Sequence, residues 1–295
     1  MLEALFISIA VLLRVISNPL GNVFQKQLTG KGHHPLLVSF VTYLFLSVIC
    51  IGLAVYVRRQ ELPAEFWLYS FLAGVVGALG NGFLVKALEK GELSVLGPIN
   101  SYKSVVGIII AIFLLNEIPN LWGVLGILLI ICGSYFVLDT TEGRFGWALL
   151  KKTEIQYRMW AMILTAIEAV FLKKIILASS TTIAFISWCW FGAVFSFLLI
   201  LTYKLKLKYE IRKVGLSDFS KYVFLVCCIG TMQFTTNYAF DKMPVGYALS
   251  LFQLSIILSV FLGHKIFKEK DIRKKLIGST IMIVGSIVII LLKNK

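Results

Sequence analysis

Long apolar stretches dominate this chain, and short charged segments separate them. A helix that spans a bilayer needs about 20 mostly apolar residues, and each stretch meets that requirement. The stretches cover roughly residues 2–24, 35–57, 66–88, 92–115, 120–138, 157–176, 182–203, 220–240, 244–266 and 274–292. The pattern predicts an all-α polytopic membrane protein with ten transmembrane helices.

The second half of the chain repeats the first at a shift of 152 positions, without a gap between residues 87 and 136. The aligned pairs include Ala87 with Ala239, Glu89 with Asp241, Lys90 with Lys242, Glu117 with Glu269, Gly126 with Gly278, and Gly133 with Gly285. Because five helices per half is an odd number, the second half would be inverted in the membrane. We expect a first five-helix repeat at 1–138, a connecting loop at 139–156 and a second five-helix repeat at 157–295.

Composition supports a membrane protein and argues against a soluble one. Hydrophobic residues make up 58% of the chain and charged residues only 15%, whereas soluble domains have about 25% charged residues. The 29 Lys and Arg outnumber the 15 Asp and Glu, but the bases cluster between apolar stretches. There they orient helices and meet lipid headgroups, so we expect the lipid bilayer as a partner and no nucleic acid.

Motifs for catalysis and metal binding are absent from the sequence. There is no HExxH, GxSxG or Walker loop, and the five cysteines have no C-x-x-C spacing. We therefore expect no enzyme, no cofactor and no metal site. The first apolar stretch carries Arg14 and no small-residue cleavage site, which favours a retained helix over a signal peptide.

Three charges lie near the middle of apolar stretches: Arg14, Lys103 and Glu168. A charge at the bilayer centre costs about 2.5–3.5 kcal/mol on insertion scales, so it faces protein or a water-filled cavity. Amides and small polar residues accompany these charges at helical spacing. The predicted substrate-binding residues are Arg14, Asn18, Asn22, Asn100, Lys103, Gln233, Asn237 and Gln253, with Glu168 as the coupling candidate. Structural pairing of Glu168 with either base is the alternative, and Glu117 and Glu269 are expected to be solvated or to cap turns.

Other patterned residues favour packing over binding. Gly74, Gly77, Ala78 and Asn81 recur at helical spacing in the third stretch, and Gly126, Gly133, Gly278 and Gly285 are expected at close helix contacts. The aromatic residues of the seventh stretch are ambiguous, with packing favoured over a ligand site; they are Trp188, Trp190, Phe191 and Phe195.

The repeated segment resembles the EamA family of the drug/metabolite transporter superfamily, over nearly the whole chain. The resemblance rests on Ala-Leu-Glu-Lys-Gly-Glu-Leu at 87–93, Pro98, Glu117, Gly126 and Gly133. The second copy keeps Ala239, Asp241, Pro244, Glu269, Gly278 and Gly285, but has Ser250 in place of the helix proline. This resemblance implies a ten-helix carrier that works by alternating access, with the first, third, fourth, sixth, eighth and ninth helices around a central cavity. It does not specify the substrate.

We expect a secondary transporter for a small metabolite, and the surplus of cavity bases favours an anionic one. A flippase-like translocator of a lipid-linked or amphipathic compound is the alternative on the same fold. The coupling proton or ion, the direction of transport and the oligomeric state stay open. The expected location is the plasma or inner membrane. Twenty Lys and Arg on one side against seven on the side of the termini predict external termini, whereas the resemblance favours cytoplasmic ones.

Overall fold

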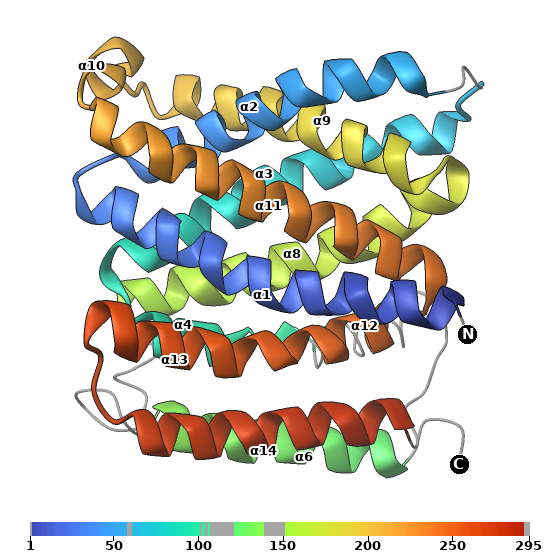
Figure 1. Cartoon of the computed structure of the whole chain (residues 1–295), viewed down its shortest axis with the longest axis vertical. Helices are drawn as coiled ribbons and strands as arrows, with labels where there is room; N and C mark the ends of the chain where they lie inside the picture. The colour runs from blue at the N-terminus through green and yellow to red at the C-terminus, as the bar shows by residue number, and fades with distance from the viewer. Residues whose placement is uncertain are drawn as a thin grey trace.

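The computed structural model describes residues 2–57, 61–100, 102, 103, 106, 121–138 and 151–291, and within these ranges the regular elements are all helical (Figure 1). The helices are α1 Leu2–Gly30, α2 Pro35–Tyr56, α3 Ala64–Lys90, α4 Leu93–Ile99, α6 Leu121–Leu138, α8 Thr153–Ala178, α9 Thr181–Thr202, α10 Leu207–Arg212, α11 Leu216–Lys242, α12 Val245–Leu251, a 3-10 turn at Phe252–Leu254, α13 Ser255–Phe267 and α14 Ile272–Leu291. Apolar stretches thus form helices, and several helices extend a turn beyond the stretch that predicted them.

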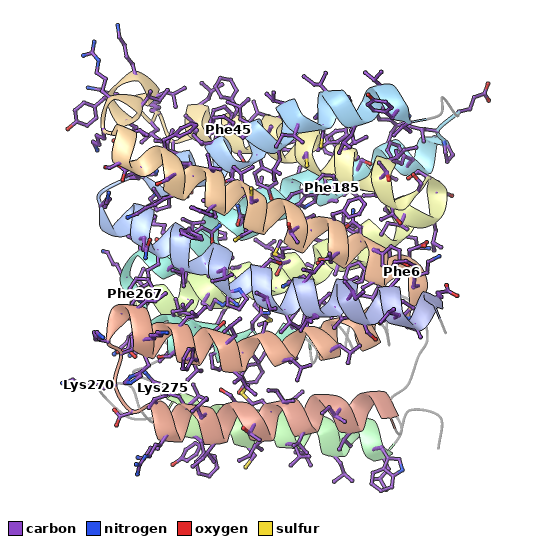
Figure 2. The ribbon with its side chains drawn as sticks, in the orientation of Figure 1. Phe6, Phe45, Phe185, Phe267, Lys270 and Lys275 are labelled. Atoms are coloured by element: carbon purple, nitrogen blue, oxygen red, sulfur yellow. The ribbon has the colours of Figure 1, made fainter. Side chains whose placement is uncertain are left out.

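Five of the described helices are long and apolar enough to cross a membrane. They are Glu3–Gly30, Pro35–Tyr56, Ala64–Lys90, Thr181–Thr202 and Ser217–Lys242. Their outer surfaces carry large apolar side chains that stay about half exposed, such as Phe6 and Phe45, which are 52% and 46% exposed (Figure 2). An exterior of this kind suits lipid rather than water.

Two of the expected helices differ from a simple continuous span. The ninth stretch, 244–266, is divided into α12, the 3-10 turn and α13. In the fourth stretch α4 runs to Ile99, beyond which most residues, including Ser104, Gly107 and Glu117, lie outside the described residues. Near Pro98 the Asn100 N–H bonds to the carbonyl of Gly97, three residues back, so the backbone tightens there.

Helices of the two halves lie side by side in four pairs: α1 with α11, α3 with α8, α2 with α9, and α6 with α14 (Figure 1). The α6–α14 pair is held close by glycines. A Cβ added to Gly278 would lie 2.5 Å from the Gly133 carbonyl oxygen, and one added to Gly285 would lie 2.6 Å from that of Gly126. The prediction that these four glycines lie at close helix contacts is confirmed.

The described helix ends define two faces of the bundle. The α1–α2, α3–α4 and α13–α14 connections lie at one edge, called here the connection face, and the start of α1 and the end of α14 lie at the opposite edge (Figure 1). Lys270 and Lys275 lie at the connection face (Figure 2). The largest buried apolar cluster lies between α2, α8, α9 and α11, where Tyr43 and Trp188 meet with ring centroids 4.7 Å apart.

Candidate functional site

A polar cavity lies in the interior of the bundle, where α1, α3, α4, α8, α9 and α11 meet the broken ninth stretch. It contains about 860 Å³ not filled by atoms, including space open to solvent. Seven of the residues predicted from the sequence line it: Arg14, Asn18, Asn22, Asn100, Lys103, Glu168 and Gln233. The structure therefore brings mid-helix charges from separate helices to one site, as the cost of exposing them to lipid requires.

Arg14 is held in place by its Nε, which donates to Thr236 Oγ1 at 2.8 Å. Its guanidinium carbon also lies 4.8 Å from the ring centroid of Phe252. The Nη1 nitrogen is buried and has no hydrogen-bond partner among the described residues. A fixed guanidinium with an unused donor can bind an oxyanion, because its planar fork matches a carboxylate or phosphate.

The Glu168 carboxylate is positioned by two residues that the sequence favoured as packing. The Trp188 Nε1 donates to Glu168 Oε1 at 2.7 Å, and both side chains are buried. Gly77 leaves the room that the carboxylate occupies, since an added Cβ would lie 2.4 Å from Oε1. Trp188 and Gly77 thus belong to the site, and Trp188 also lines the cavity.

Arg158 is a cavity residue that the sequence analysis included only in the count of twenty bases on one side. Its position beside the 139–156 connection led us to count it among the bases of that side, but α8 begins at Thr153 and Arg158 is only 6% exposed. Its Nε donates to the Leu96 carbonyl in α4 at 2.8 Å, and its side chain lines the cavity. The count on that side falls to nineteen, which leaves the imbalance of bases unchanged.

Two predicted binding residues do not reach the cavity surface. Asn237 is fully buried, and its side-chain amide lies at hydrogen-bond distance, 2.8 Å, from Gln233 Nε2. Gln253 is 2% exposed and donates to the Leu249 carbonyl at 3.1 Å. Both amides lie behind the wall of the cavity, whereas Asn81 and Thr165, which the sequence assigned no binding role, line it.

Comparison with known proteins identifies the family of the chain. The model of the EamA-like transporter family matches residues 5–139 and again residues 153–291. The chain belongs to the EamA-like transporter family. EamA belongs to the drug/metabolite transporter superfamily, so this EamA-family chain is an integral membrane transporter of small solutes and not an enzyme.

Curated relatives of this EamA-family chain carry different names. A protein of Streptococcus pyogenes serotype M1, named as a proposed sugar uptake protein, is 23% identical over 95% of this chain and 93% of its own length. The triose phosphate/phosphate translocator of non-green plastids from Brassica oleracea var. botrytis is 29% identical over 43% of this chain and 32% of its own length. The phosphoenolpyruvate/phosphate translocator 1 of Arabidopsis thaliana is also 29% identical, over 43% and 31%.

A solved structure, described only as the crystal structure of a protein, superposes on nearly the whole chain. Its TM-score is 0.71 at 18% identity, over 97% of this chain and 98% of that chain. At this identity the likeness concerns the fold alone. The fold is therefore one that an experimental structure already contains.

Proposed function

We propose that this EamA-family chain is a secondary transporter that moves a small anionic metabolite by alternating access. The proposed architecture has ten transmembrane helices in two inverted halves, residues 1–138 and 157–295, joined by 139–156. The two separate matches to the family model support a repeat. The two halves would alternate in opening the central cavity to the two sides of the membrane.

The pairing of helices supports a two-fold relation between the halves. Under the shift of 152, Gly126 corresponds to Gly278 and Gly133 to Gly285. The close contacts run crosswise, between Gly133 and Gly278 and between Gly126 and Gly285. A two-fold axis between α6 and α14 would produce this crosswise pattern, in which residue i meets j and j meets i. The crossed pairs α1 with α11 and α3 with α8 fit the same axis.

The observation that best supports an anionic substrate is the Nη1 of Arg14, which has no hydrogen-bond partner among the residues that the structure describes and lies in a cavity that Lys103 also lines. Among the described residues that line this space, three are basic (Arg14, Lys103 and Arg158) and one, Glu168, is acidic. A carboxylate or phosphate would satisfy Arg14 through charge-assisted hydrogen bonds, with Lys103 as a point charge. The phosphate translocators among the relatives agree with an anionic ligand.

Glu168 is proposed to couple transport to a proton or another cation, or to orient one of the cavity bases. Its hydrogen bond from Trp188 holds the carboxylate toward the cavity in a single position. The two roles separate in one experiment on Glu168→Gln. Loss of gradient-driven uptake with retained exchange indicates coupling, whereas loss of both indicates orientation of a base.

The proposed location is the plasma or inner membrane, with both termini on the external side. The excess of Lys and Arg at the connection face supports this orientation. A reporter fused after Lys295 that is active only in the cytoplasm would reverse it.

A translocator of an amphipathic compound is the second candidate, because an apolar groove lies on the surface between α1 and α11. The groove is lined by Phe6, Ile9, Ala10, Leu13, Phe234, Thr235 and Tyr238. One of these residues, Thr235, is the neighbour of Thr236 in α11, whose hydroxyl accepts a hydrogen bond from Arg14 in the cavity. If a substrate bound with its headgroup on Arg14 and its acyl chain in this groove, only compounds with a long apolar chain would be transported.

A binding screen on the purified protein tests the proposal and separates the two candidates. Thermal stability is measured with glycerol 3-phosphate, succinate, lactate, glucose and dodecyl phosphate. We expect the small anions to raise Tm and glucose to have no effect, and Arg14→Gln and Lys103→Gln to abolish the increase. Stabilisation by dodecyl phosphate alone supports the amphipathic substrate. Equal responses of both variants and the wild type would refute an anion site.

A further inference from the structure

Three basic side chains from both halves share the cavity with one carboxylate. Arg14 and Lys103 come from the first half, and Arg158 and Glu168 come from the second. The lining groups therefore carry a formal charge of +2 in their ordinary ionised forms. Uncompensated charge in a low-dielectric interior is unfavourable, so a ligand that brings two negative charges fits this site better than one that brings a single charge.

We propose that the substrate is a small dianion, either a phosphate monoester or a dicarboxylate, and that Arg158 determines this preference. The proposal rests on the anion site of the proposed function. Arg14 and Arg158 are each fixed through Nε, to Thr236 Oγ1 and to the Leu96 carbonyl, both at 2.8 Å. These bonds hold both guanidinium groups in defined planes on the wall of one cavity.

The proposed preference for a dianion is tested by measuring the affinities of four probes for the wild type and for Arg158→Gln. Glycerol 3-phosphate and succinate carry about two negative charges near pH 7.5, lactate one and glucose none. We expect the wild type to bind one of the two dianions at least tenfold more tightly than lactate. Arg158→Gln should lower the affinity for that dianion by about 10- to 100-fold, the range for a hydrogen bond to a charged group. The affinity for lactate should fall much less in this variant, because Arg14 and Lys103 can still neutralise a single negative charge.

Lys174→Gln is the matched control, since it removes a base from the exposed side of the same helix. It should leave the affinity for all four probes unchanged. Arg158→Lys should restore part of the dianion preference, which a purely structural defect would not show. If Arg158→Gln lowers the affinities for the dianion and for lactate by the same factor, Arg158 does not determine the dianion preference, and the proposed anion site itself still stands. Whichever of glycerol 3-phosphate and succinate binds more tightly identifies the kind of dianion, a phosphate monoester or a dicarboxylate.

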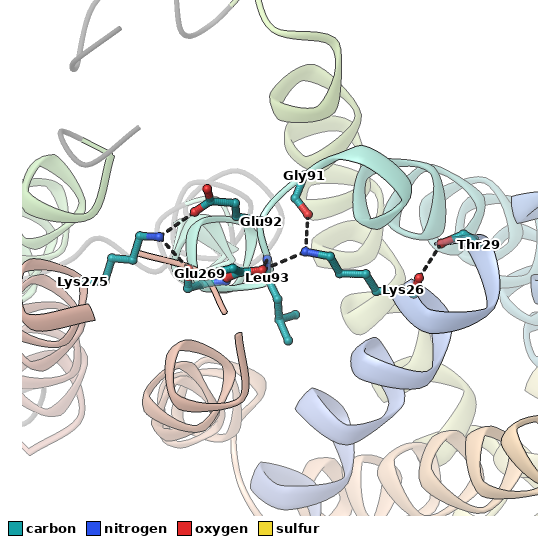
Figure 3. A network of polar contacts seen from close by, with 8 residues as sticks. Lys26, Thr29, Gly91, Glu92, Leu93, Glu269 and Lys275 are labelled. Atoms are coloured by element: carbon teal, nitrogen blue, oxygen red, sulfur yellow. Dashed lines mark hydrogen bonds and ion pairs between the residues drawn. The ribbon is translucent and has the colours of Figure 1, made fainter. Parts of the chain in front are cut away.

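An independent observation concerns the connection face, where one carboxylate joins the halves (Figure 3). Glu269 Oε1 accepts hydrogen bonds from Leu93 N and from Lys26 Nζ, and Oε2 accepts one from Ser94 N, each at 2.8 Å. Lys26 Nζ also donates to the Gly91 carbonyl at 2.9 Å. A side chain of the second half is thus bound by α1 and by the start of α4 in the first half.

The surroundings of Glu269 are shaped for this contact. The carboxylate is buried, and a Cβ added to Gly263 would lie 2.3 Å from Oε2. Burial acts to raise the pKa of Glu269, but the hydrogen bonds from Lys26 and Ser94 outweigh it and the pKa lies below its ordinary value. The Lys275 Nζ donates a hydrogen bond to Ser94 Oγ at 2.8 Å. The charged or titratable side chains around the carboxylate are Lys26, Glu92, His264 and Lys275.

We infer that the Lys26–Glu269 pair locks the two halves together at the connection face, and that it breaks each time the cavity opens to that side. This second proposal rests on alternating access but not on the nature of the substrate. The sequence predicted that Glu269 would be solvated or would cap a turn; it does cap the start of α4, but across the halves and with 7% exposure. Separation of the halves here must break every bond to the carboxylate.

Accessibility of a cavity thiol tests the lock without any substrate. Thr165→Cys, in a background without the native cysteines, places a reporter on the cavity wall. A membrane-impermeant maleimide is applied from the connection face of oriented proteoliposomes. Glu269→Gln and Lys26→Gln should each raise the labelling rate at least fivefold. Glu210→Gln is the matched control, because it removes an ion pair with Lys213 inside one connection of the same half.

A cross-link provides the opposite perturbation. The Lys26→Cys/Glu269→Cys protein, bridged by a short bifunctional thiol reagent with a cleavable disulfide, should lose labelling of the reporter from the connection face and recover it on reduction. Failure of the two thiols to cross-link contradicts the contact itself. Unchanged labelling of the cross-linked protein, or equal rates for Glu269→Gln and Glu210→Gln, overturns the lock. Neither result bears on whether anions bind the cavity.

Discussion

Replacing Gly77 by alanine should displace the Glu168 carboxylate. The added Cβ would lie 2.4 Å from Oε1 and 3.0 Å from Cδ, which is closer than side-chain atoms approach one another. The backbone of α3 cannot yield easily, because α3 packs along α8, which carries Glu168. The carboxylate must therefore move, and its 2.7 Å bond from Trp188 Nε1 must lengthen or break.

The size of the effect follows from two contributions. A hydrogen bond to a charged group contributes about 1.5–3 kcal/mol, and overpacking an interior costs about 1–3 kcal/mol. We therefore expect a loss of roughly 2.5–6 kcal/mol in the free energy of unfolding and a fall in Tm of about 5–12 °C, at about 2 °C per kcal/mol for a chain of this size. The assay is thermal unfolding in detergent, followed by the fluorescence of the Trp residues.

Gly52→Ala is the control, because an alanine there would have no neighbour within 4 Å of its Cβ. It should change Tm by no more than about 1 °C, as expected for a surface substitution. If Gly77→Ala behaves like Gly52→Ala, the carboxylate does not occupy the space beside α3 and the description of the site is wrong.

Three further predictions concern the site wall, the helix pair and the lock. Trp188→Phe keeps an aromatic ring but removes the indole N–H together with the five-membered ring, and should lower the free energy of unfolding by at least about 1.5–3 kcal/mol; an unchanged Tm would contradict the hydrogen bond. Gly278→Leu should force α14 away from Gly133 and lower Tm in detergent by far more than the exposed control Ile277→Leu. Because the pKa of Glu269 is depressed, its lock is present above the ordinary pKa of about 4.3 and weakens as pH falls below it. The ratio of the labelling rates of Glu269→Gln and wild type, measured at each pH, should be constant from pH 8 to 5, because the thiol reactivity cancels in the ratio. A change in this ratio between pH 7 and 6 would assign the lock to another group.

Apolar length and mid-helix charge account for most of what the sequence predicted. Stretches of about 20 apolar residues became helices because bilayer thickness and backbone hydrogen bonding leave few alternatives. Arg14, Lys103 and Glu168 met in one cavity because lipid exposure would be costly for each. The length of an apolar stretch and the position of a charge within it can both be read from a short segment of sequence, so neither prediction depends on distant residues.

The structure adds to the sequence analysis, or differs from it, where residues distant in the chain meet. Arg158 lies at the start of its stretch, and only the contact with Leu96 in α4 makes it a buried cavity residue. Trp188 and Gly77 gain their roles from Glu168, which lies on another helix. Asn237 shares helical spacing with Gln233, but a hydrogen bond between the two amides keeps it behind the wall. Spacing along one helix cannot distinguish these cases.

The most direct test of the central claim is counterflow in proteoliposomes that contain the purified protein. Vesicles loaded with unlabelled glycerol 3-phosphate, succinate or lactate are diluted into the same labelled compound, and glucose serves as the neutral comparison. The account predicts accumulation of at least one labelled anion, no accumulation of glucose, loss of most uptake in Arg14→Gln and unchanged uptake in Lys174→Gln. Accumulation of glucose without any anion, or equal uptake by Arg14→Gln and wild type, would contradict transport through the basic cavity.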